Sequence, residues 1–221
     1  MMNNLFLIFE PSSVIKLPMN WIISLMLILI MPLNFWMIPN RMMMMSWILI
    51  KFLISELKMI LKKNNLIIFF ISIFFFFMVN NFLGLFPYIF TSTSHLSTNL
   101  TLSLPLWLAL MMFGWINNYN HMFSHLIPQG TPSVLMPFMV LIETTSNVIR
   151  PITLAVRLTA NMIAGHLLLN LLSSLKNNLP THLLVFLILI QIILIVLEMS
   201  VAIIQSYVFM ILTSLYSSEI N

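Results

Sequence analysis

Two long apolar stretches near the end of the sequence strongly constrain what this chain can fold into. The first, residues 134–174, is forty-one residues long, with Pro137 and Pro151 as its breakers. The second, residues 182–217, follows a short polar turn. As α-helices they would be about 60 Å and about 54 Å long, whereas the hydrocarbon core of a bilayer is about 30 Å thick. Even a tilt of about 40° leaves them too long, so we expect two steeply inclined helices that form a hairpin.

The composition indicates that the bilayer is the solvent of this chain. Hydrophobic residues make up 61% and charged residues 6% of the sequence, against about a quarter charged in soluble domains. No polar stretch is long enough to fold alone, so residues 1–221 are predicted to form a single all-α, multi-pass membrane domain. Five of the nine basic residues lie in one segment, which favours a role in topology over nucleic-acid binding. The absence of cysteine excludes disulfides and thiolate metal sites.

The remaining segments are shorter. Three are predicted spans, at residues 21–38, 66–90 and 102–116. Residues 41–63 carry charges at mixed three-, four- and seven-residue spacings, which is typical of an amphipathic helix on a membrane face. Residues 92–101 and 117–133 are predicted loops.

The basic segment also predicts the orientation. Residues 41–63 contain five bases against one Glu, so they should face the matrix or cytoplasm. Counting spans from there places the N-terminus on the opposite side. Loop 117–133 and the C-terminus then lie with the matrix, and loop 175–181 lies opposite.

The first long helix carries a polar stripe. Glu143, Arg150 and Arg157 are spaced by seven, which drifts by about 20° on a straight helix, and Asn147 and Asn161 join them at steps of four. An arginine at a bilayer centre costs about 2.5–3.5 kcal/mol and cannot lose its charge. Arg157 is therefore a functional hypothesis, whereas Glu143 with Arg150 is equally well explained as a structural ion pair.

The second long helix carries a matching stripe. Gln191, Glu198 and Gln205 also step by seven, and Glu198 has no base within two turns. Its carboxyl must be protonated, hydrated or paired across helices. On the first helix, His166 is nine residues past Arg157, about 180° around it. A lone histidine there is more often a satisfied buried side chain, and Gln191, Asn147 and Asn170 are best explained as interhelical hydrogen-bonding residues.

The stretch IETTSNVIRPITLAVRLTANMIAGHLL, followed by LIVLEMSVAIIQSYVFMILTSLY, resembles subunit a of the F-type ATP synthase, in particular its mitochondrial, insect-like versions. The resemblance covers nearly the whole chain, and RLTANMIAGH is its most specific motif. It implies a proton-translocating stator subunit in the mitochondrial inner membrane that is not an enzyme on its own. The implied partners are the ring of c subunits, the peripheral-stalk subunit b, small accessory F0 subunits, the lipid bilayer and protons.

The resemblance also implies roles for individual residues. Arg157 would be the essential charge facing the c-ring, and Asn161 and Gln205 its polar neighbours. His166 and Glu198 would line the half-channel from the intermembrane space, and Glu143 the path towards the matrix. The resemblance implies no role for Arg150, no cofactor and no metal.

Two other functions remain open from the sequence. A haem- or metal-bearing oxidoreductase would need His pairs at mid-depth, and although His121 and His125 have a spacing that suits a metal, no third ligand is evident. In a plain scaffold subunit, Arg157 would only pair with an acid of a partner. Replacing Arg157 by Lys should be tolerated by a scaffold and should abolish coupled transport in a translocator.

Overall fold

The computed structural model describes residues 6, 9–12, 19–26, 38–61, 65–86, 89–127, 132, 135–175 and 180–220. Within these ranges every regular element is a helix, and four of the helices are long and apolar enough to cross a membrane. These four are α3 (Asn65–Gly84), α4 (Leu96–Asn117), α6 (Met136–Leu175) and α7 (Thr181–Ile220). The predicted class, an all-α multi-pass membrane protein, is confirmed.

Four further elements lie in the described part. They are the 3-10 helices η2 (Met19–Met26) and η3 (Ser92–Ser94), and the α-helices α2 (Arg41–Ile60) and α5 (Tyr119–His125). Of the span predicted at residues 21–38, the first six residues belong to η2, and residues 27–37 lie outside the described residues. Of the amphipathic helix predicted at 41–63, α2 accounts for Arg41–Ile60, and residues 62 and 63 lie outside them. Part of the loop predicted at 117–133 is helical, as α5.

The connection between α3 and α4 differs from the prediction at both ends. α3 ends at Gly84, six residues before the predicted end at residue 90. The residue before a proline disfavours helical backbone, and Phe86 stands before Pro87. The chain then returns close over Gly84, because a Cβ added there would lie 3.0 Å from Thr91 Cγ2.

α4 begins at Leu96, inside the segment predicted to be a polar loop at 92–101. Two of its polar side chains donate hydrogen bonds to the backbone of the preceding turn. The Thr98 hydroxyl donates to the carbonyl oxygens of Ser92 at 2.7 Å and His95 at 2.8 Å. The buried Asn99 amide donates to the Thr93 carbonyl at 2.8 Å. Local hydrogen bonds of this kind favour a helix start, which is why the span is longer than predicted.

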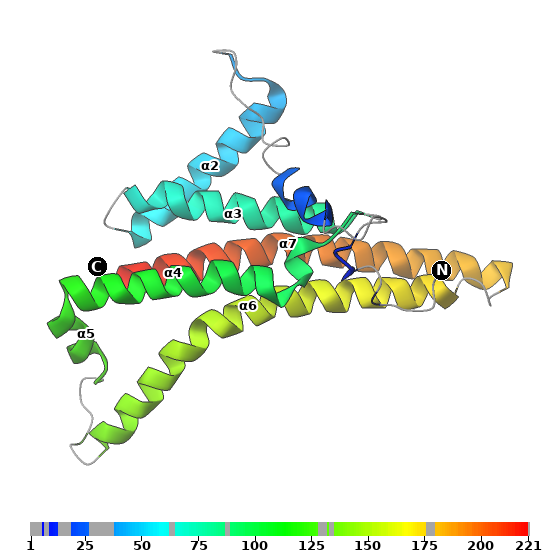
Figure 1. The fold of residues 1–221 in the computed structure, drawn as a ribbon. Helices are drawn as coiled ribbons and strands as arrows, with labels where there is room; N and C mark the ends of the chain where they lie inside the picture. Colours follow the sequence, from blue (N-terminus) through cyan, green and yellow to red (C-terminus); the bar gives the residue numbers. More distant parts are fainter. Residues whose placement is uncertain are drawn as a thin grey trace.

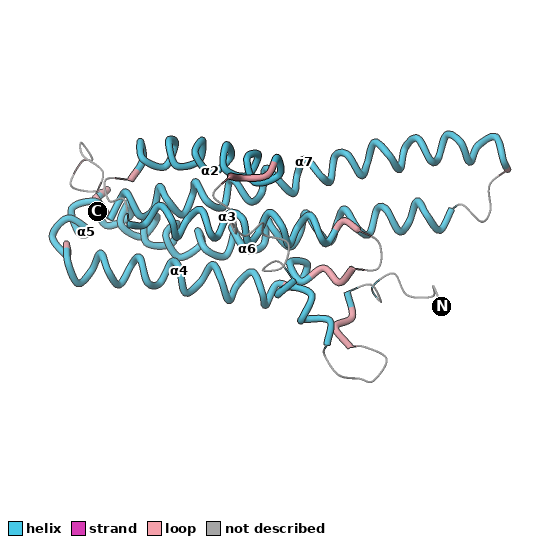
Figure 2. The backbone as a smooth tube through the Cα atoms, turned by 90° about the horizontal axis from the view of Figure 1, so that it is seen from above, coloured by secondary structure: helices cyan, strands magenta, loops and turns pink. Residues whose placement is uncertain are grey.

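α6 and α7 form a hairpin and lie side by side along half of the molecule (Figures 1 and 2). α3 packs on α7, and α4 packs on α6. The first part of α6 bends away from the other helices (Figure 1). Pro151 lies inside α6, and a proline removes one helical hydrogen bond and kinks the helix.

Two apolar clusters hold α7 in place. One joins α2, α3 and α7 through Leu57, Phe70 and Met210, which are almost completely buried. The other includes Phe77 of α3 and Phe209 of α7, whose ring centroids are 4.5 Å apart. Full burial of such side chains contributes about 1.5–3 kcal/mol each. These contacts fix which face of α7 is turned towards α6.

α2 is also tied to α7 by a hydrogen bond. The Tyr207 hydroxyl donates to Glu56 Oε2 at 2.9 Å, and both side chains are half-buried. The carboxylate of Glu56 is therefore turned towards the bundle. The two residues are 151 positions apart in the sequence.

Candidate functional site

Arg157 projects from the outer face of α6, near the middle of that helix. It is the twenty-second of the forty residues of α6. Ala155 is completely buried, and a residue two positions further lies about 200° around the helix. Accordingly Arg157 is exposed. Within the part of the chain that the structure describes, its guanidinium has no hydrogen bond and no ion pair.

Small side chains surround Arg157 on the same face. Thr153, Ala160 and Ala164 are exposed and lie four, three and seven residues from it. Small residues allow another helix to approach closely in a membrane. The outer face of α6 thus combines a permanent cation with room for a closely packed neighbour.

Glu198 of α7 packs directly on Gly165 of α6. The side chain is 8% exposed, and a Cβ added to Gly165 would lie 2.7 Å from Glu198 Cδ and even closer to Oε1. The absence of a side chain at Gly165 is what lets the carboxylate reach the surface of α6. Neither carboxylate oxygen has a hydrogen-bond partner among the described residues.

His166 follows Gly165 and is half-buried. Its Nε2 atom is also buried, without a partner in the described ranges, and its ring meets the edge of Phe9 at 6.2 Å. The structure therefore places Glu198 beside the consecutive residues Gly165 and His166, while Arg157 points outwards. The sequence predicted this difference in direction between Arg157 and His166, but the closeness of Glu198 to Gly165 could not be read from one helix.

The polar stripe of α7 faces α6, because its member Glu198 contacts Gly165. Gln191 and Gln205, seven residues to either side, are half-buried. Asn161 on α6 is also half-buried. No hydrogen bond between Asn161 and Gln205 is found in the described part, so these amides remain candidates for contacts outside the chain.

The polar stripe predicted on the first long helix begins on the first part of α6, the bent arm that turns away from the other helices. The Ser146 hydroxyl donates to the Glu143 backbone carbonyl at 2.9 Å, and Glu143 Oε2 lies 3.4 Å from the same hydroxyl. The guanidinium carbon of Arg150 lies 4.9 Å from the ring centroid of Tyr216, near the end of α7. A contact of this kind is worth about 0.5–2 kcal/mol. This contact joins α6 to α7 next to Pro151. The spacing of residues in the sequence did not predict it.

The sequence reasoning also missed a cavity of about 200 Å³ between η2, η3, α3 and α4, which is lined by both apolar and polar side chains. Thr93 and Asn99 line it, and Thr93 Oγ1 and Asn99 Oδ1 are buried without a partner in the described residues. Water occupies cavities that are roomy and polar. The signal that could have revealed it is the density of Ser, Thr and Asn in the segment predicted to be a loop.

No group of three or more His, Asp or Glu side chains is placed to hold a metal ion in the part of the chain described by the structure. His121 lies on the short helix α5.

Four helices that are long and apolar enough to cross a membrane define a multi-pass membrane protein, and an exposed arginine and a buried carboxylate within such helices are typical of the ion-translocating class. Comparison with known proteins narrows this class. The family model described as ATP synthase A chain matches residues 17–218. ATP synthase subunit a of Drosophila melanogaster is 54% identical over 224 aligned residues, and that of Anopheles quadrimaculatus is 56% identical over 226. That of Locusta migratoria is 53% identical over 224, and each alignment covers both chains completely.

The chain therefore belongs to the ATP synthase A chain family, and its relatives are the insect forms of subunit a. It is a membrane subunit of the F0 part of ATP synthase and takes part in proton transport and ATP synthesis.

Proposed function

We propose that this chain is the stator subunit in which Arg157 faces a ring of c subunits and controls the charge of their carboxylates. The observation that carries the proposal is the outward, unpaired position of Arg157 among small neighbours, within the described residues. A permanent cation in this place needs an anion from outside the chain, because no carboxylate of the described part pairs with it. The proposed location is the mitochondrial inner membrane.

The electrostatics support this role. A ring carboxylate in lipid is stable only when neutral. At about 4 Å from Arg157, with an effective dielectric constant near 20, the ionised carboxylate gains about 4 kcal/mol. Arg157 thus favours release of the proton when the carboxylate arrives. Because arginine keeps its own proton, it cannot pass protons directly between the two sides of the membrane.

Glu198 and His166 are proposed to deliver protons on the intermembrane side. Their support is the packing of Glu198 on Gly165, next to His166, with unpaired buried polar atoms on both side chains in the described part. A carboxylate and an imidazole both exchange protons with water. Glu143, on the bent arm of α6, is proposed to line the path on the matrix side, and Asn161 and Gln205 to be polar neighbours of Arg157.

In this proposal the chain performs no phosphorylation chemistry itself. The c subunits supply the proton-carrying carboxylate, and the peripheral-stalk subunit b and small accessory subunits hold the chain still. Each proton that crosses 100 mV yields about 2.3 kcal/mol, which ring rotation transmits to the catalytic part of the complex.

The test replaces Arg157 by Gln and by Lys in the assembled complex. ATP-driven acidification of inverted membrane vesicles is measured, and subunit content reports assembly. We expect both variants to assemble and to lose coupled pumping. Arg150→Gln is the matched control, because it removes the same charge seven residues away, and it should retain most of the pumping.

The outcomes separate a translocator from a scaffold. Normal pumping by assembled Arg157→Lys would support a scaffold and contradict the proposal. Equal losses in Arg150→Gln and Arg157→Gln would show that the charge of the stripe matters but Arg157 has no special place in it.

A further inference from the structure

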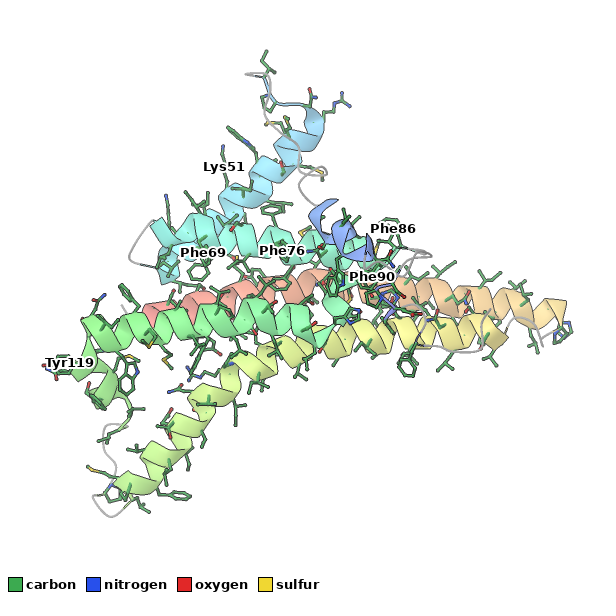
Figure 3. The ribbon with its side chains drawn as sticks, in the orientation of Figure 1. Lys51, Phe69, Phe76, Phe86, Phe90 and Tyr119 are labelled. Carbon is green, nitrogen blue, oxygen red and sulfur yellow. The ribbon has the colours of Figure 1, made fainter. Side chains whose placement is uncertain are left out.

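The outer face of α2 is divided into two stripes by its packing on the bundle. Leu53 and Leu57 are buried against α3 and α7. Lys51 and Lys58 are exposed and, being seven residues apart, share one direction to within about 20°. Figure 3 shows Lys51 on the outer edge of α2. Lys58 follows Leu57 directly, so the lysines form an exposed basic stripe about 100° around α2 from its packed face.

The second stripe is apolar. Met45, Phe52 and Met59 are also spaced by seven, and they are 71%, 59% and 90% exposed. Phe52 follows Lys51 directly, so the two stripes lie about 100° apart around the helix. Three faces thus share α2: one packed on protein, one apolar and exposed, and one basic and exposed.

The net charge of the outer face is positive. Glu56 is the acidic residue of α2, and its carboxylate accepts the hydrogen bond of Tyr207 on the packed side. Lys51 is held in place by Trp47, whose ring centroid lies 5.4 Å from the lysine Nζ. Tryptophan and lysine are the side chains that favour the headgroup region of a bilayer.

We propose that the outer face of α2 is a binding surface for anionic phospholipid headgroups. The apolar stripe enters the acyl region, and Lys51 and Lys58 bind lipid phosphates beside it, as in helices that lie in the membrane interface. The argument for lipid is charge complementarity, since the outward charge is basic and lies next to an exposed apolar stripe. The proposal requires that the chain is a membrane protein, and it does not depend on the role of Arg157.

The experiment uses the assembled complex in nanodiscs. A cysteine introduced at Ser55, which is exposed and one turn past Lys51, carries a fluorophore, and a complex without this cysteine gives the background. The chain has no cysteine of its own. Quenching by headgroup-labelled phosphatidylglycerol is compared with quenching by equally labelled phosphatidylcholine. Phosphatidylglycerol should quench more strongly, and the preference should weaken at high salt.

The lysine variants decide the outcome. A basic residue near an anionic surface contributes about 1 kcal/mol, so Lys51→Gln and Lys58→Gln should each reduce the preference roughly fivefold. Lys51→Arg should retain it. A preference that is unchanged in the double glutamine variant would overturn the proposal. Equal quenching by the two lipids would overturn it as well, and quenching by neither would show that a protein partner covers this face.

Discussion

Replacing Gly165 by Ala gives a direct test of the contact between α6 and Glu198. The new Cβ would lie 2.7 Å from Glu198 Cδ and 3.0 Å from Cγ, whereas ordinary contacts begin at 3.4 Å. Gly165 lies in the interior of a long helix, ten residues before its end, so its backbone cannot easily move. The side chain of Glu198 has to move instead, away from the step between Gly165 and His166.

The expected size of the effect follows from the overlap. Forcing an extra methyl group into a packed site costs about 1–3 kcal/mol. If this cost appears in the rate of proton transfer, it corresponds to a fall of roughly 5- to 150-fold. We therefore expect Gly165→Ala to assemble normally and to conduct protons at least several-fold more slowly than the wild type.

The assay is passive proton conductance of the F0 part in vesicles, driven by a potassium diffusion potential. Glu198→Asp in the Gly165→Ala background shortens the acid by one methylene and should restore part of the conductance, so that the two changes are not additive. Gly84→Ala is the matched control, because its Cβ would meet Thr91 Cγ2 at 3.0 Å, without any carboxylate nearby. Wild-type conductance in Gly165→Ala, or a double variant slower than both single ones, would refute the reasoning.

Three further predictions concern the packing of the helices. Tyr207→Phe removes the hydrogen bond to Glu56 and should lower the stability of the complex by about 0.5–1.5 kcal/mol; thermal unfolding in detergent measures this loss, and an unchanged midpoint would contradict it. Tyr216→Leu removes the ring beneath Arg150 and should cost about 0.5–2 kcal/mol; the same assay should show Tyr216→Phe close to wild type, and equal losses in the two variants would contradict the cation–π interpretation. Phe77→Ala removes a side chain that is 1% exposed and should lower the free energy of unfolding by about 3–5 kcal/mol, which native gels would show as poor assembly. Normal assembly with an unchanged melting midpoint would contradict the packing of Phe77 in the core.

The sequence was most informative about single helices, because hydrophobic length and seven-residue spacing are properties of one element. It placed Glu143, Arg150 and Arg157 on one stripe of a straight helix. In the structure Pro151 separates the last two: Arg150 contacts the ring of Tyr216 on α7, whereas Arg157 is exposed. It could not give the rotation of one helix against another. The contact between Glu198 and Gly165 depends on that rotation, and it is set by apolar packing elsewhere on α7.

The segment between α3 and α4 was the least predictable part. Its serine, threonine and asparagine residues have the composition of a solvated loop. In the structure Ser92, Thr93, Ser94 and Asn99 are buried. Thr98 and Asn99 donate hydrogen bonds to backbone carbonyls. Composition alone cannot separate a polar segment that faces water from one that provides hydrogen bonds inside a membrane protein, because both need the same side chains.

The two ionisable groups at the centre of the hairpin face opposite environments, and this arrangement limits what the chain can do alone. Glu198 is covered by the protein, so water or a neighbouring side chain must supply its partner. Arg157 is exposed on α6, and in the proposed function its partner comes from another molecule. An arginine left facing lipid costs about 2.5–3.5 kcal/mol or more, and a partner that removes this cost stabilises the chain by mass action. If Arg157 acts as proposed, it makes the isolated subunit less stable and makes assembly with an acidic partner more favourable. An arginine whose only role was packing would lower the stability of the isolated subunit without making assembly more favourable.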